Sequence, residues 1–118
     1  MTPSEFVQSL KTECADAAVC DCLSLLQEPP GHKPAQSLVT LSNWYRGLSP
    51  DDQANVVAAM REAADSTLFG VLCVLDGVRV VEHQPVKSDF LFTATRNGLE
   101  SVISPGPEYL HDILRAEP

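Results

Sequence analysis

A long stripe of apolar residues, from Val57 to Leu75, constrains the fold of this 118-residue chain more than any other feature. Its members recur every three or four positions, which is the spacing of one face of an α-helix. Ser49 is a suitable N-cap, Pro50 suits the first helical position, and the two aspartates that follow complement the positive end of the helix dipole. The pattern predicts a long central helix from about Asp51 to Leu75.

A β-hairpin is the competing interpretation of the end of this segment. Asp76-Gly77 stands between the apolar runs 69–75 and 78–82, and Asp-Gly between such runs is a strong hairpin signal. The helix is favoured because its stripe stays in phase across Gly70. Gly77 would then end the helix in a left-handed conformation.

Two further helices are predicted before the central one. Helical spacing of apolar residues predicts a helix from about Ser4 to Gln27, and it stops where two prolines and a glycine open the linker Pro29 to Pro34. A shorter helix is expected from Gln36 to Arg46, with Gly47 closing it and either Trp44 or Tyr45 on its apolar side.

After Gly77, apolar residues recur at every second position, which is the spacing of a β-strand. It predicts a short strand from Val78 to Glu82, then a hairpin of the segments 90–96 and 99–104 around a type I′ turn at Asn97-Gly98. A two-residue turn would pair Arg96 with Leu99, Ala94 with Ser101 and Phe92 with Ile103. The face expected to be buried consists of Phe90, Phe92, Leu99 and Ile103.

A last helix is predicted from Glu108 to Arg115, after Pro105-Gly106-Pro107. Its inward residues would be Tyr109, Leu110, Ile113 and Leu114. The whole pattern predicts an α+β fold with helices first, then a small antiparallel sheet, then a short helix. The chain is expected to form one domain over residues 1–118 because no polar linker divides it.

Charge and hydropathy limit the classes of partner. Sixteen acidic residues oppose eight basic ones, for a net charge of -8 shared by both halves of the chain. Such a surface repels nucleic-acid phosphates and anionic lipid and favours a basic protein partner. The longest apolar run is too short to span a membrane, and the N-terminus does not look like a secretory signal. We therefore expect a cytoplasmic protein that binds neither nucleic acid nor membrane.

The sequence contains no phosphate loop, dinucleotide fingerprint, nucleophile elbow or zinc-protease motif. Cys14, Cys20 and Cys22 diverge around the first predicted helix, so they are expected to be buried thiols without a metal. The three histidines are far apart and are expected at the surface. No catalytic residue, cofactor or metal ligand is therefore predicted, and the chain is interpreted as a non-enzyme; an enzyme with a dispersed site is an alternative.

The only tryptophan, Trp44, adjoins Tyr45, and such a pair is either a core anchor or an interface hot spot. Together with the acidic Asp76 and Glu82, these two residues are the candidate partner-binding residues. The apolar segment 69–81 is expected to be buried inside the single chain, with part of a homodimer interface as the alternative.

Four stretches carry a resemblance to known proteins. They are Pro-Pro-Gly-His-Lys-Pro at 29–34, Leu-Ser-Asn-Trp-Tyr at 41–45, the segment from Leu68 to Val78, and Tyr-Leu-His-Asp-Ile at 109–113. Together they resemble a family of small uncharacterised bacterial proteins, and because that family has no established activity, the resemblance assigns no catalytic residue to this chain. In size and acidity the chain is similar to immunity proteins that neutralise bacterial toxins. The expected function is therefore binding of a protein, such as a basic toxin, with a structural or regulatory homodimer as the alternative.

Overall fold

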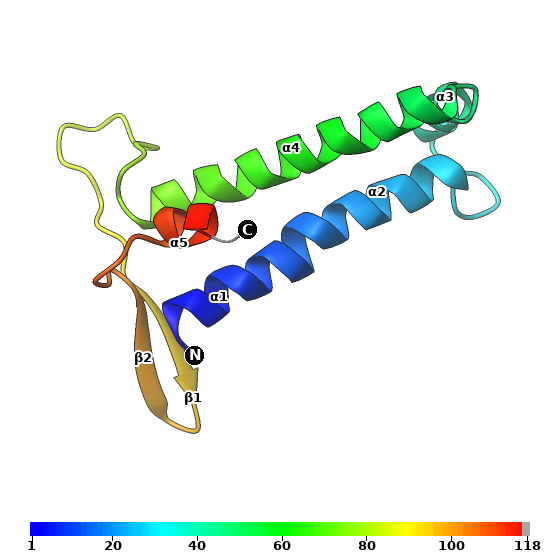
Figure 1. The fold of residues 1–118 in the computed structure, drawn as a ribbon. Helices are drawn as coiled ribbons and strands as arrows, with labels where there is room; N and C mark the ends of the chain where they lie inside the picture. Colours follow the sequence, from blue (N-terminus) through cyan, green and yellow to red (C-terminus); the bar gives the residue numbers. More distant parts are fainter. Residues whose placement is uncertain (117–118) are drawn as a thin grey trace.

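The computed structural model describes residues 1–116, which form a long helical hairpin with smaller elements at one end (Figure 1). The first arm consists of α1 (Pro3–Leu10), the π-helical segment η1 (Lys11–Asp16) and α2 (Ala17–Gln27). A turn containing α3 (Gln36–Arg46) leads into the second arm, α4 (Pro50–Leu75). The strands β1 (Phe92–Arg96) and β2 (Leu99–Ser104) and the helix α5 (Leu110–Ala116) follow. The predicted α+β class is confirmed.

A capping box sets the start of the first arm, and a proline sets its end. Thr2 and Glu5 form a reciprocal capping box at its start. At its end, the carbonyl of Leu26 would normally accept the amide of residue 30, but Pro30 has no N–H. The buried Ser42 of α3 donates its hydroxyl to that carbonyl instead, at 2.5 Å. This hydrogen bond joins α3 to the end of the first arm.

The long helix is confirmed, and the competing hairpin at residues 76–77 is wrong. Ser49 caps α4 by accepting the amide of Asp52. Gly77 has a φ of 76° and ends the helix. The amide of Val78 donates to the carbonyl of Cys73, and that of Gly77 donates to Val74. These two bonds are a Schellman motif, which satisfies carbonyls at the helix end.

The predicted strand from Val78 to Glu82 is wrong. The amide of Val78 is used by the Schellman motif, and that of Arg79 also donates to Cys73. Within the described residues, the sheet consists of β1 and β2 alone, so the segment has no strand beside it to complete a ladder. Alternation of apolar residues without a neighbouring strand is not enough to form one.

The β-hairpin follows the predicted register near its turn and departs from it at the far end. Asn97 and Gly98 both have positive φ, and Arg96 pairs with Leu99. A bulge after Phe92 then shifts the ladder by one residue, so that Phe92 pairs with Ser104 and not with Ile103. Of the face predicted to be buried, Ile103 is fully buried and Phe92 partly buried. Phe90 and Leu99 are exposed, so the prediction fails for them.

The main core lies at the end of the hairpin that carries α5 and the sheet. It combines residues of the first arm, the last turns of α4, β2 and α5: Val7, Ala15, Leu68, Leu72, Ile103, Leu110, Ile113 and Leu114. The ring of Phe6 packs on that of Phe92, with centroids 4.8 Å apart, and holds the β-hairpin against α1. Tyr109 was predicted to point inward with its neighbours in α5, but it is exposed.

The molecule is extended for its length. Its Cα radius of gyration is 18.4 Å, whereas a compact domain of this size has about 13.5 Å. Its accessible surface is 8182 Å², against about 6,300 Å² for a compact protein of the same mass. Across residues 1–116, none of the helices is both long and apolar enough to cross a membrane.

Candidate functional site

An apolar groove runs between the two helical arms. It is formed by two adjoining cavities of about 490 and 190 Å³, which share Ala18, Ala63 and Ala64. The larger cavity is lined by Leu10, Cys14, Ala15, Ala18, Ala63, Ala64, Thr67, Leu68 and Val71. The smaller one adds Val19, Cys22 and Met60. We call the surface formed by these residues the helix groove.

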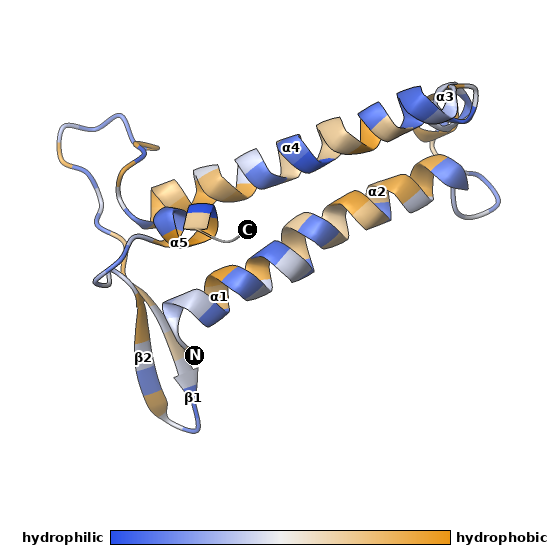
Figure 2. Ribbon diagram, in the orientation of Figure 1, coloured by the Kyte–Doolittle hydropathy of each residue, from blue (hydrophilic) through white to orange (hydrophobic). Residues whose placement is uncertain are grey.

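The spacing of the sequence creates this groove. On the first arm, the residues Leu10, Cys14, Ala18 and Cys22 follow one another at steps of four and so lie along one side. Figure 2 shows apolar residues recurring along both arms. The first arm carries alanine and cysteine in the groove and the middle of α4 carries alanine, and these short side chains leave the space between the helices unfilled. All residues that line the groove are uncharged.

The first part of α4 is poorly covered by the rest of the chain. Every residue from Pro50 to Thr67 is exposed or partly exposed, and burial begins at Leu68. Val71, at the edge of the groove, is 50% exposed. Long helices in water are normally held by packing of an apolar face, since helical propensity alone is a weak stabiliser. The stretch of α4 that lines the groove, from Met60 to Val71, is about three turns long, and Leu68 is the one buried residue among its lining residues.

A second cluster joins the end of α4 to the start of α5. Asp76 accepts hydrogen bonds from the amides of Leu110 and His111, at 3.0 and 2.9 Å, and from Nδ1 of His111 at 2.5 Å. The side chain of Asp76 is 2% exposed and that of His111 15%. The prediction that His111 lies at the surface is therefore wrong. The two residues are 35 positions apart in sequence, so no local pattern links them.

The contacts of His111 hold α5 against α4. Its ring stacks on Tyr109 and meets the edge of Phe69, while the guanidinium of Arg115 lies 4.0 Å from the centre of the Phe69 ring. Its other ring nitrogen, Nε2, is 3.5 Å from Asp112. Both oxygens of Asp76 are occupied by the first turn of α5. The cluster thus caps α5 and fixes it on α4.

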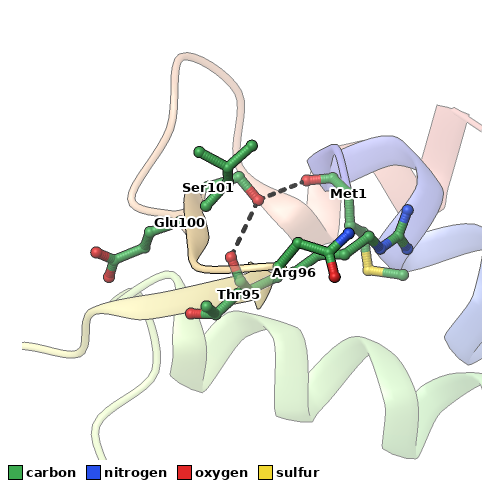
Figure 3. A pocket seen from close by; sticks show the side chains of 8 residues that line it. Met1, Thr95, Arg96, Glu100 and Ser101 are labelled. Carbon is green, nitrogen blue, oxygen red and sulfur yellow. Dashed lines mark hydrogen bonds between the residues drawn. The ribbon is translucent and has the colours of Figure 1, made fainter.

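A third hollow, of about 440 Å³, lies beside the β-hairpin and the N-terminus (Figure 3). The hydroxyl of Ser101 lies 3.1 Å from the carbonyl of Met1 and 3.3 Å from that of Ala94, and it can donate its single proton to one of them at a time. In Figure 3 the carboxylate of Glu100 points away from Met1. These polar groups hold the N-terminus to β2 and do not converge on a common point.

The structure does not bring the four predicted partner-binding residues together. Trp44 is 52% exposed on α3, whereas Tyr45 is 5% exposed and is the inward-facing member of the pair. Asp76 is buried at the opposite end of α4, where it caps α5. Glu82 accepts hydrogen bonds from the amide and the hydroxyl of Ser88. No sequence motif indicates the helix groove. The one signal in the sequence is the step of four residues between Leu10, Cys14, Ala18 and Cys22.

The cysteines are less buried than predicted. Cys14 and Cys20 are exposed, Cys22 is partly exposed, and Cys73 alone is buried among these four thiols. In the part of the chain that is described, no three histidine, cysteine, aspartate or glutamate side chains are grouped as metal ligands would be. Comparison of the chain with protein-family models, with curated proteins and with solved structures gave no match.

Proposed function

We propose that this chain is a protein-binding module, and that the helix groove is its binding surface. The observation that carries the proposal is the combination of an uncharged, apolar groove with a long helix in which no residue from Pro50 to Thr67 is fully buried. A groove between two helices is a common receptor for an apolar helical face. The chain acts through this contact, by binding and not by turnover.

The net charge of -8 favours a different contact, with a basic partner. In this second candidate function, the acidic surface steers a basic protein, such as a bacterial toxin, and the chain neutralises it. The candidate residues for this contact are Trp44, which is exposed, and Glu82, which is partly exposed. The uncharged groove supports the first candidate more directly, because it defines where a partner binds.

Site-specific photocrosslinking in the cells that make the protein tests the groove. A benzophenone amino acid at Val71 lies at the edge of the groove, and one at Glu62 lies about 180° around the same helix. We expect a discrete protein adduct from position 71 and none from position 62. The mass of the adduct tells whether the partner is another copy or a different protein. Failure of position 71 to form any protein adduct contradicts the proposed function.

A further inference from the structure

We propose that the partner in the helix groove is a second copy of this chain. This inference rests on the proposed function, because it names the occupant of the same surface. Two copies would pack groove to groove, so that the arms α1–α2 and α4 of each copy together form a four-helix bundle. Helical hairpins bury their apolar faces in this way when they associate.

The amount of uncovered surface supports a homodimer. The accessible surface of the chain, 8182 Å², exceeds that of a compact protein of this mass by about 1,900 Å². Obligate homodimers bury about 2,000 to 5,000 Å² in total over both subunits. Two copies thus have enough surplus surface for such an interface, and the helix groove is one part of that surplus beside the extended segment 77–91 and the β-hairpin.

The chemistry of the groove also suits a second copy. A two-fold interface places the same surface on both sides, so any charge at its centre faces its own like charge. The lining residues are uncharged, and the acids of this chain lie outside that lining. The small residues Ala18, Ala63 and Ala64 at the middle allow the two pairs of helices to approach closely. Larger side chains, Leu10, Met60 and Val71, lie toward the ends of the groove.

The thiols provide an internal probe of the contact. Cys14 lines the groove and Cys20 does not, although both are exposed in the single chain. Groove-to-groove packing should cover Cys14 and leave Cys20 open. A dimer formed through the β-hairpin or the segment 77–91 would leave both open.

The test uses the purified 118-residue chain, reduced beforehand and then freed of reductant. Sedimentation velocity at 1 to 100 µM should give twice the 12.8 kDa of one chain. Brief maleimide labelling with mapping by mass spectrometry should modify Cys14 at least about tenfold more slowly than Cys20, because a buried thiol is inaccessible to the reagent. A monomer over the whole range, or equal labelling rates in a dimer, overturns the proposal.

Matched variants locate the interface. Ala63→Glu places a charge in the groove and should weaken the dimer by about a hundredfold or more. Ala58→Glu places the same charge on an exposed position about 140° around α4 and should leave the dimer unchanged. Equal effects of the two substitutions contradict the proposal. Because the wild-type mass and the labelling rates need no substitution, the proposal stays testable if Ala63→Glu fails to fold.

The outcomes separate this inference from the proposed function. If the purified chain is monomeric while position 71 crosslinks to a different protein in cells, the groove binds proteins but its occupant is not a second copy. If neither self-association nor a groove adduct is found, both proposals fail.

Discussion

At the scale of single residues, the most connected side chain is Asp76. It lies just after α4, and its two oxygens accept three hydrogen bonds from the first turn of α5. A carboxylate in this position satisfies amides that α5 itself cannot use and interacts with the positive end of its dipole. The last turn of the long helix is thereby tied to a helix that begins more than thirty residues later.

Substitution of Asp76 by alanine should therefore destabilise the protein strongly. Two backbone amides and a largely buried imidazole would lose their acceptor, and we expect a loss of about 3 kcal/mol in the free energy of unfolding. Asp76→Asn keeps one acceptor oxygen and should lose less. Urea unfolding followed by circular dichroism measures both.

The control for this prediction is Asp112→Ala. Asp112 lies on the other side of the same histidine, but its side chain is 59% exposed and its contact is longer, at 3.5 Å. Its removal should change the stability by about 0.5 kcal/mol or less. A similar loss for both aspartates would show that the cap does not depend on Asp76.

At the scale of elements, the turn between β1 and β2 depends on Gly98. Its φ of 77° lies in the left-handed region, which a β-branched residue resists. Gly98→Val should cost about 2 kcal/mol, because β2 also delivers the fully buried Ile103 to the core. Gly47→Ala is the control, since Gly47 has right-handed helical φ and ψ and an added Cβ would meet only ordinary contacts. Thermal unfolding measures the melting temperatures of both variants. Equal melting temperatures would show that the turn does not depend on Gly98.

Elements with local chemical signals could be predicted from the sequence. Ser49-Pro50 gave the start of α4 and Gly77 its end, because capping is decided by a few adjacent residues. Asn97-Gly98 located the β-hairpin for the same reason. The bulge after Phe92 could not be predicted, because no local turn signal marks it; at this point Phe92 packs on Phe6 of α1.

The features of the candidate site were harder to predict because they depend on packing. Periodicity places Trp44 and Tyr45 next to each other, but only the position of α3 against the first arm decides that Tyr45 is the buried one. The contact of Asp76 with His111 joins distant segments. The helix groove could not be predicted because the helical spacing of apolar residues indicates a face that is buried within the chain. Here the chain leaves part of that face, on both arms, open to solvent.

At the scale of the whole molecule, the net charge of -8 gives the two candidate contacts opposite salt dependences. Two copies repel each other at long range, so screening should favour their association, while attraction to a basic partner is weakened by salt. We expect the dissociation constant of the homodimer to fall by about three- to tenfold between 50 and 500 mM NaCl. Sedimentation at the two ionic strengths measures it. Self-association that weakens as salt rises would contradict this expectation.

If a second copy covers the helix groove, as proposed, the stability of α4 depends on the abundance of the protein. Where a helix is stabilised by a second molecule, its stability follows mass action and rises with the concentration of the protein. A newly made chain that has not met its partner would hold the region from Pro50 to Thr67 only loosely, and loosely held helices are opened and cut by proteases. Unpaired copies would then be removed faster than assembled ones, so that the cell keeps the chain mainly in its bound form.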